Sequence, residues 1–355
     1  MNERVVVAMS GGVDSSVAAA LLKGKGFEVI GITMCFSLSD SGRNRPACCG
    51  AQAAEDARRV CQKLDIPHYT LNMRKALEDY VIDDFCRQYL SGRTPNPCVR
   101  CNQYLKFGLL LQKARAFKAR FLATGHYARI EKSSKYFCLK KARDLTKDQS
   151  YFLYRLGRRE LKDAIFPLGE YTKIEVRRLA EKFSLPVADK PASQDICFLP
   201  HNDYRAFLKE RMSRYFRPGL IKDTQGEILG THKGIAFYTI GQREGLGIAR
   251  GYPLYITRLD CRSNEVIVGK IKEAYKKSFV LEEAHFIMPS PKKRIALGVR
   301  IRYNHKEAMA NIMPFKKQLK VEFLKPQFAV TPGQSAVFYE KDRVLGGGII
   351  GKVLD

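Results

Sequence analysis

Residues 5–16, which read VVVAMSGGVDSS, restrict the fold of this chain more than any other stretch. The three valines and the apolar residues after them predict a short buried strand. The pair Gly11-Gly12 ends that strand, and the Ala, Leu and Val of residues 17–22 are typical of a helix. A strand that turns at glycines into a helix leaves backbone N–H groups pointing outwards, and the helix dipole there favours negative charge. The sequence therefore predicts a phosphate-binding turn.

This turn differs from the two common nucleotide-binding motifs. No Gly-Lys-Ser/Thr follows, as a P-loop would require, and the three spaced glycines of a dinucleotide fingerprint are absent. An ordinary strand–turn–helix, with Asp14 or Ser15 as the helix N-cap, is the alternative interpretation.

The first half of the chain alternates between strand and helix patterns. Apolar strands are predicted at 28–34, 68–72 and 121–124, and helices at 51–64, 77–90 and 104–119. This alternation predicts an α/β fold with a doubly wound parallel sheet, in which ligands lie beyond the carboxyl ends of the strands. Ser10, Met34 and Gly125 fall at such ends.

The pattern changes after residue 129. Short strands come first, then helices at 174–183 and 202–212, and past Pro218 strands separated by glycines take over. The last part, with short strands at 279–281, 296–301, 319–323 and 336–339, suits a small β-barrel. We expect three domains: a catalytic domain over 1–200, a central β-rich domain over 201–275 and a C-terminal β-barrel that contacts nucleic acid over 276–355.

Composition points to a polyanionic partner. The 355 residues contain 62 Lys and Arg against 36 Asp and Glu, a net charge of +26, which favours nucleic acid unless the source organism's proteins are all basic. No apolar run approaches 18 residues, and the chain enters a strand at once. We therefore expect neither a membrane span nor a signal peptide, and a cytoplasmic location.

Five of the ten cysteines stand outside apolar periodic contexts: Cys48, Cys49, Cys98, Cys101 and Cys197. The Cys-x-x-Cys pair lies in residues 92–102, where two prolines predict a stiff loop. Two arginines in that stretch are expected to lower the pKa of the thiols and favour thiolate. Half of a structural zinc site, completed by Cys48 and Cys49, is an alternative.

Together these motifs identify a family. The chain resembles the tRNA-specific 2-thiouridylases (the MnmA/TrmU family) over essentially its whole length. The shared motifs are Ser-Gly-Gly-Val-Asp-Ser-Ser, Gly-Arg-Thr-Pro-Asn-Pro, Ala-Thr-Gly-His-Tyr, Lys-Asp-Gln-Ser-Tyr-Phe-Leu, Ile-Cys-Phe, Gly-Gln-Arg-Glu-Gly-Leu-Gly and Thr-Pro-Gly-Gln-Ser-Ala-Val. The first of them resembles the pyrophosphate loop of ATP pyrophosphatases, which adenylate an oxygen and release pyrophosphate.

The resemblance implies an ATP-dependent thiolation of the wobble uridine, position 34, of tRNA. ATP turns the uracil C2 oxygen into a leaving group, and a sulfur nucleophile attacks C2. Cys197 is then expected to carry a persulfide from a sulfur-donor protein, and Cys101 to release the sulfur and close a transient disulfide with Cys197. Asp14 shapes the loop or helps to hold Mg²⁺. The residues expected to bind ATP are Ala8, Met9, Ser10, Gly11, Gly12, Val13, Asp14, Ser15, Ser16, Met34 and Gly125.

One position departs from the best-described members of the family, which carry Asp where this chain has Cys98. That Asp is thought to act on the target base as a general acid or base, a role that a thiol hardly fills. Cys98, Cys101 and Cys197 are therefore also candidate ligands of a [4Fe–4S] cluster whose fourth iron binds sulfide. The persulfide and cluster routes both stay open at this point.

The resemblance also implies contacts with the anticodon arm of tRNA. The base to be modified must leave its stack, and we expect it to face the segment that contains Cys98. The residues expected to contact tRNA are Asn96, Pro97, Cys98, His126, Lys147, Asp148, Gln149, Arg302, Tyr303 and Gln334. Two of these have structural alternatives as well, because His126 suits a strand end and Asp148 suits a helix N-cap.

Two other functions remain in competition. A synthetase acting on a small acid shares the phosphate-binding loop but does not need the three cysteines or the strong positive charge. A non-catalytic RNA-binding protein would use the loop to bind a regulatory nucleotide. Pyrophosphate release that requires tRNA separates the thiolation reading from both.

Overall fold

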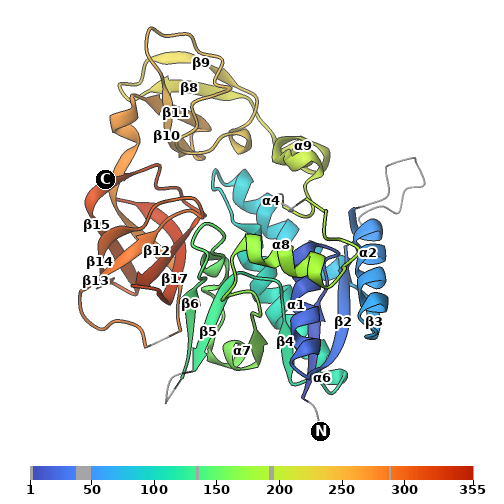
Figure 1. Cartoon of the computed structure of the whole chain (residues 1–355). Helices are drawn as coiled ribbons and strands as arrows, with labels where there is room; N and C mark the ends of the chain where they lie inside the picture. Colours follow the sequence, from blue (N-terminus) through green and yellow to red (C-terminus); the bar gives the residue numbers. More distant parts are fainter. Residues whose placement is uncertain (1–2, 37–48, 133–135, 192–195, 288, 355) are drawn as a thin grey trace. The chain divides into compact units, whose positions relative to one another are not determined.

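The structure is a computed structural model that describes residues 3–36, 49–132, 136–191, 196–287 and 289–354. Its internal contacts divide the chain into two compact units. The first comprises Met1–Val81, Cys98–Phe198 and Asp342–Val344, and the second comprises Ile82–Pro97, Leu199–Lys341 and Leu345–Asp355. The elements of both units are labelled in Figure 1.

A five-stranded parallel sheet forms the centre of the first unit. Its strands are β1 (Arg4–Ala8), β2 (Glu28–Cys35), β3 (His68–Asn72), β4 (Phe121–Ala123) and β7 (Ala164–Ile165), in the order β3-β2-β1-β4-β7. Val6 of the central strand pairs with Ile30 on one side and with Leu122 on the other. Both faces of β1 are covered, because Val5, Val6 and Val7 are fully buried. The predicted doubly wound parallel sheet is confirmed.

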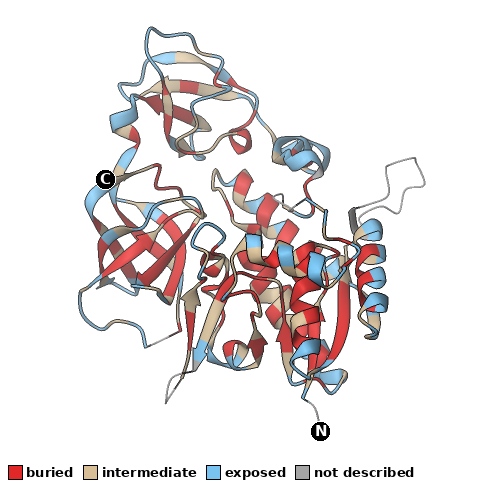
Figure 2. Cartoon of the chain, in the orientation of Figure 1, coloured by how far each residue is buried: buried red, intermediate tan, exposed pale blue. Residues whose placement is uncertain are grey.

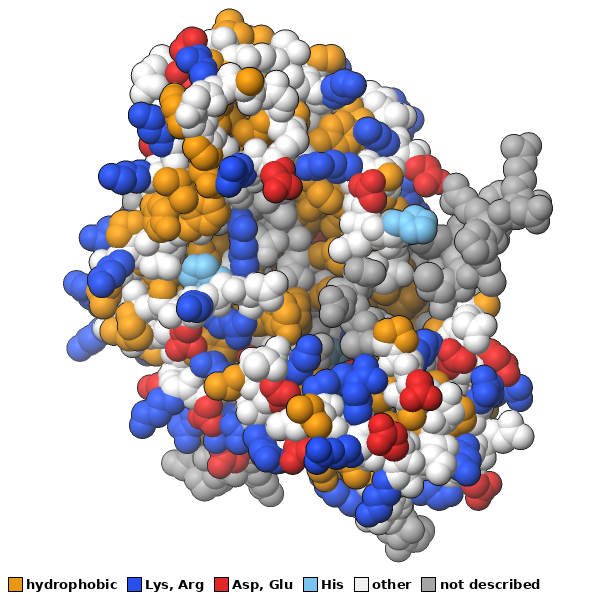
Figure 3. Space-filling model, turned by 45° about the horizontal axis from the view of Figure 1, so that its top comes forward, with side chains coloured by type: hydrophobic (Ala, Val, Ile, Leu, Met, Phe, Trp, Pro, Cys, Tyr) orange, Lys and Arg blue, Asp and Glu red, His pale blue; other side chains and the backbone are white. Residues whose placement is uncertain are grey.

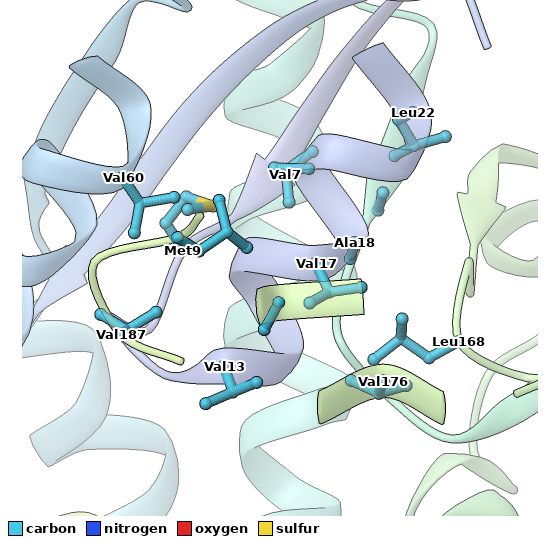
Figure 4. Packing of buried hydrophobic residues seen from close by; sticks show 14 of the residues in the cluster. Val7, Met9, Val13, Val17, Ala18, Leu22, Val60, Leu168, Val176 and Val187 are labelled. Atoms are coloured by element: carbon cyan, nitrogen blue, oxygen red, sulfur yellow. The ribbon is translucent and has the colours of Figure 1, made fainter. Parts of the chain in front are cut away.

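Helices and one hairpin complete the first unit. The helices are α1 (Val13–Gly24), α2 (Cys49–Lys63), α3 (Arg74–Leu77), α5 (Pro97–Arg100), α6 (Leu111–Ala116), α7 (Arg158–Asp163) and α8 (Lys173–Lys182). Two π-helical segments (Glu78–Ile82 and Cys101–Leu110), a 3₁₀ turn (Ser150–Leu153) and the hairpin β5 (Ala128–Lys132)–β6 (Phe137–Lys141) lie between them. Figure 4 shows Val13 and Val17 of α1 in one apolar cluster with Val176 of α8 and Val187. This cluster fixes the start of α1, where the phosphate-binding turn was predicted.

The second unit contains a four-stranded sheet with its own core. Its strands are β8 (Gly219–Asp223), β9 (Ile228–His232), β10 (Tyr255–Asp260) and β11 (Glu265–Gly269), in the order β10-β11-β8-β9. Ile221, Ile256 and Val266 are buried between them. The unit's helices are α4 (Asp83–Leu90) and α9 (Tyr204–Met212), and its 3₁₀ turns are Pro200–Asn202, Ser213–Tyr215, Ile235–Phe237 and Ile271–Ala274.

Six further strands form a closed barrel. They are β12 (Tyr275–Phe286), β13 (Ile295–Arg300), β14 (Ala308–Phe315), β15 (Gln318–Phe328), β16 (Ser335–Glu340) and β17 (Arg343–Val353). Their order is β12-β15-β14-β13-β16-β17, and a pairing of β12 with β17 closes the ring. The inward side chains of Phe279, Val299, Phe323 and Phe338 are fully buried, and Figure 2 shows much of these strands as buried. The predicted C-terminal barrel is confirmed.

Most predicted elements are present, with three strands missed and one segment wrong. The strands that were not predicted are β7, which has two residues, β14, which contains Pro314, and β17, which contains three consecutive glycines. Residues 92–102 were predicted as a loop, but Pro97–Arg100 begins a helix that continues as a π-helical segment from Cys101. Proline is tolerated at the first helical position, so the prolines allow this start. The domain boundaries near 200 and 275 stay predictions.

No helix within the described part of the chain is both long and apolar enough to cross a membrane.

Candidate active site

The predicted phosphate-binding turn lies at the carboxyl end of the central strand. Helix α1 begins at Val13 with Gly12 as its N-cap, and no side chain caps it, so the alternative of an Asp14 or Ser15 cap is wrong. Gly11 has a φ of +68°, which favours glycine, and a Cβ there would lie 2.2 Å from the backbone oxygen of Ala53 in α2. Gly11 therefore allows both the left-handed backbone of the turn and the close approach of α2.

The serines of the turn bond mainly to the turn itself. The Ser15 hydroxyl accepts from the Ser10 backbone N–H at 3.2 Å and donates to the Gly12 carbonyl at 3.1 Å. The Ser16 hydroxyl donates to the same carbonyl at 2.8 Å and is fully buried. Ser10 is exposed and lies 3.2 Å from the Ser15 hydroxyl. Ser10 thus faces solvent, whereas Ser15 and Ser16 hold the turn in shape.

Two lysines that sequence analysis missed reach this turn. The Asp14 carboxylate accepts from the Lys173 ammonium at 2.6 Å and from the Tyr127 hydroxyl at 2.8 Å, both at Oδ1. The Lys190 ammonium donates to the Gly11 carbonyl at 3.0 Å and to Asp56 of α2 at 2.6 Å. No local motif marks either lysine, because only the packing of α8 and the chain after it brings them to the turn.

The other expected ATP-binding residues line the same edge of the sheet. Ala8 ends β1, Met9 is buried after it, and Met34 is the penultimate residue of β2. Gly125 follows β4, and a Cβ there would come within 2.8 Å of the Asp14 and Ser15 backbone. The predicted convergence of Ser10, Met34 and Gly125 at the strand ends is confirmed by the parallel pairing of β1 with β2 and β4.

The three singled-out cysteines belong to the first unit and influence one another. Cys98 lies in α5, and Cys101 starts the π-helical segment and is buried. Cys197 is exposed, and its thiol is close enough to the other two for their charges to raise its pKa. All three are free thiols. Cys48 lies outside the described residues, as does the side chain of Cys49, so the zinc alternative stays a prediction.

The expectation of lowered thiol pKa values is wrong. Burial, together with the neighbouring Cys101, raises the pKa of Cys98 to about 11, and burial also raises the pKa of Cys101. Desolvation by the surrounding protein raises the pKa of Cys197 to about 12, although its side chain meets solvent. The Arg93 guanidinium, expected to favour thiolate, instead pairs with Glu282 at 2.7 Å.

Lys106 is the cation that opposes these shifts. Its charge lowers the pKa of each of the three thiols. Lys106 follows Cys101 by five residues in the π-helical segment, and because π-helices bond from i to i+5, this is about one turn. Its ammonium also lies 3.4 Å from His126 Nε2. This lysine was not predicted, because residues 92–102 were expected to form a loop that ends before Lys106.

The geometry does not gather ligands for a metal. Within the ranges that the structure describes, no three His, Cys, Asp or Glu side chains lie close enough together to hold a metal ion. Asp14, expected to shape the loop or help hold Mg²⁺, is engaged by Lys173 and Tyr127. The three cysteines are among the described residues and are not grouped as a metal site there. The [4Fe–4S] cluster and Mg²⁺ both stay predictions.

Several expected tRNA contacts of the first unit are engaged within the protein. His126 is buried, with Nδ1 2.7 Å from the Thr124 hydroxyl, and burial lowers its pKa well below the ordinary value, helped by Lys106. Asp148 is 2% exposed, and its carboxylate accepts from the Ala142 and Ser150 backbone N–H groups. Lys147 is exposed. Of these three, Lys147 alone presents its side chain to solvent.

The expected contacts of the second unit have partners as well. The Arg302 guanidinium donates to the backbone oxygens of Ile240 and Ala329 at 2.9 and 3.1 Å. The Gln334 amide donates to the backbone oxygen of Thr94 at 2.9 Å. The Arg300 guanidinium donates to the backbone oxygen of Tyr303. The proposed contacts of Arg302, Tyr303 and Gln334 with tRNA stay predictions, as do those of Asn96, Pro97 and Gln149.

Fold and site define a class. A parallel sheet with a glycine turn at the start of α1, followed by a β-rich sheet and a closed barrel, defines an α/β protein with two β-structured extensions. Family models described as "tRNA methyl transferase HUP domain", "tRNA methyl transferase PRC-barrel domain" and "Aminomethyltransferase beta-barrel domain" match residues 3–201, 205–270 and 276–350.

Curated relatives define the family. The chain is 50% identical to "tRNA-specific 2-thiouridylase MnmA 1" of Caldanaerobacter subterraneus subsp. tengcongensis over 99% of both chains. It is 48% identical to "tRNA-specific 2-thiouridylase MnmA" of Halothermothrix orenii over 98% of this chain and 99% of that one. A solved 4-thiouridine synthetase–RNA complex with bound ATP aligns at 16% identity and a TM-score of 0.37, over 60% of this chain and 50% of that one, a likeness too low to carry an argument. The chain belongs to the MnmA family of tRNA-specific 2-thiouridylases.

Proposed function

We propose that this chain, an enzyme of the tRNA sulfurtransferase class, replaces the C2 oxygen of the wobble uridine of tRNA with sulfur at the expense of ATP. Identity of 50% over 99% of a curated 2-thiouridylase is the observation that carries the proposal. The exposed Ser10, the Gly11 turn and the start of α1 form the part that suits the phosphates of ATP. Lys and Arg side chains are spread over the face in Figure 3, which suits a polyanionic substrate.

The reaction that we propose has two stages. The uracil C2 oxygen attacks the α-phosphate of ATP, pyrophosphate leaves, and the oxygen becomes part of an AMP leaving group. The terminal sulfur of a Cys197 persulfide, delivered by a sulfur-donor protein, then attacks C2 and expels AMP. The Cys101 sulfur attacks the Cys197 sulfur, the 2-thiouridine departs and takes up the proton that Cys101 loses, and a Cys101–Cys197 disulfide forms, which an external thiol must reduce with two electrons.

The cysteine geometry supports the second stage. Cys197 is exposed, which suits contact with a donor protein, whereas Cys101 is buried and has Lys106 nearby. The raised thiol pKa values mean that little thiolate exists at neutral pH. A persulfide is a stronger acid than a thiol, so loading Cys197 with sulfur would supply an anionic nucleophile that the free thiol does not. The lowering effect of the Lys106 charge on the Cys197 pKa supports this step, because the same charge would stabilise the persulfide anion.

The test is mass spectrometry of tRNA after incubation with ATP and a persulfide donor, together with pyrophosphate release. We expect 2-thiouridine at position 34 and pyrophosphate release that requires tRNA. Release without RNA would support a small-molecule synthetase, and no release under any condition would support a nucleotide-regulated RNA-binding protein. Full turnover by metal-free protein would rule out the cluster route, whereas iron–sulfur absorbance that Cys98→Ser abolishes would favour it.

A further inference from the structure

The two lysines at the phosphate-binding turn come from a distant part of the chain. Lys173 is the first residue of α8, whose N-cap Thr172 and Glu175 form a capping box, and Lys190 follows that helix. Each ammonium makes a close contact with a carboxylate beside the turn, at 2.6 Å in both cases. Their side chains are largely enclosed, at 14% and 34% exposure. Both positions are therefore fixed by tertiary structure.

Charge makes the pairing of Lys173 with Asp14 informative. Asp14 is the second residue of α1, so its carboxylate lies at the turn that we propose to hold the triphosphate. A carboxylate alone would repel such an anion, because like charges at close range in a partly enclosed site oppose each other strongly. Lys173 removes that repulsion, and the Tyr127 hydroxyl donates a second hydrogen bond to the same carboxylate oxygen without adding charge. The Lys173 ammonium also lies 5.8 Å from the centre of the Tyr127 ring.

Lys190 acts on the backbone of the turn. The Lys190 ammonium donates hydrogen bonds to the Gly11 carbonyl and to the Asp56 carboxylate. The same carboxylate also accepts a hydrogen bond from the Gln52 amide. A peptide unit is planar and trans, so its C=O and N–H point in opposite directions. Holding the Gly11 carbonyl against Lys190 therefore turns the Gly12 N–H to the opposite side of the turn. Lys190 is a positioning residue for that N–H.

From these contacts we propose that Lys173 is a phosphate-binding residue for the triphosphate of ATP, held ready by Asp14 and Tyr127, while Lys190 positions the turn. The inference rests on the proposed function, since it assumes that the turn binds the phosphates of ATP. The alternative is that Lys173 only neutralises Asp14. The two differ in what happens when both charges are removed together.

The test measures ATP affinity directly by calorimetry in the absence of tRNA, using Lys173→Met, Lys173→Arg and the double variant Lys173→Met/Asp14→Asn of the full chain. We expect Lys173→Met to weaken ATP binding about 10- to 100-fold, the usual range for losing a charged hydrogen bond. Arginine keeps the charge and is expected to recover part of the affinity. The double variant is expected to stay weak, because the phosphates still lack their cation. Lys182→Met, at the exposed end of the same helix, is the control and is expected to bind as the unmodified chain does.

Two outcomes would overturn the inference. Full affinity in the double variant would show that Lys173 only neutralises Asp14, and unchanged affinity in Lys173→Met would show that it takes no part. Circular dichroism and tRNA binding of each variant separate a folding defect from a local one. Failure of the proposed function is distinguishable, because it would appear as absent 2-thiouridine in the unmodified chain, whatever the ATP affinities.

Discussion

Gly11→Ala tests whether the turn is fixed by contact with α2. Gly11 has a φ of +68°, and a left-handed backbone costs an alanine about 1–2 kcal/mol. A Cβ would also lie 2.2 Å from the Ala53 oxygen and 2.9 Å from its carbonyl carbon, both backbone atoms of a helix that cannot move aside cheaply. Overpacking of this kind costs about 1–3 kcal/mol more. We therefore expect a total loss of about 2–5 kcal/mol in the free energy of unfolding.

A second glycine separates the two contributions. Gly26 has a φ of +85°, but a Cβ there meets nothing within 4 Å, so Gly26→Ala carries backbone strain without a clash. Its cost is expected to be about 1–2 kcal/mol, less a few tenths because alanine also restricts the unfolded chain. Gly12→Ala, whose Cβ would lie 3.5 Å from the Ser10 hydroxyl at an ordinary φ, is expected to cost less still.

The assay is urea unfolding followed by circular dichroism, with hydrogen exchange of peptides from β1 and α1 to show that the transition reports the first unit. ATP affinity is measured on the same variants, and Gly12→Ala is expected to weaken ATP binding while leaving stability nearly intact. Equal losses for Gly11→Ala and Gly26→Ala would refute the reasoning, because the contact with Ala53 would then contribute nothing.

Two further predictions concern the cysteine site and the segment after β6. Because the pKa of exposed Cys197 is raised to about 12, its alkylation by iodoacetamide, followed by peptide mass spectrometry, should accelerate about tenfold per pH unit from 7 to 10. A plateau near pH 8 would contradict the raised pKa. Asp148→Ala leaves the Ala142 and Ser150 N–H groups without their acceptor in a buried place and should cost about 2–4 kcal/mol in thermal unfolding. Unchanged stability with weakened tRNA binding would instead place this carboxylate at the RNA.

Local patterns in the sequence determined the architecture and part of the site. Val5–Val7 followed by Gly11 and Gly12 predicted the central strand, the turn and α1, because a buried parallel strand needs continuous apolar residues and the turn needs a positive φ. Alternation of strands and helices placed Ser10, Met34 and Gly125 at one edge of the sheet. Cys98, Cys101 and Cys197 also stood out from the sequence alone, because the residues around them are neither continuously apolar nor periodic.

Tertiary structure alone decided the charges around the site. Lys173 and Lys190 reach the turn from more than 150 residues away because α8 packs on α1, and no spacing in the sequence encodes that contact. The pKa of a thiol depends on burial and on every charge nearby, so the arginines beside Cys98 in sequence predicted the wrong direction. Lys106 follows Cys101 by five residues in a π-helical segment that the sequence did not predict, and its charge acts on all three thiols.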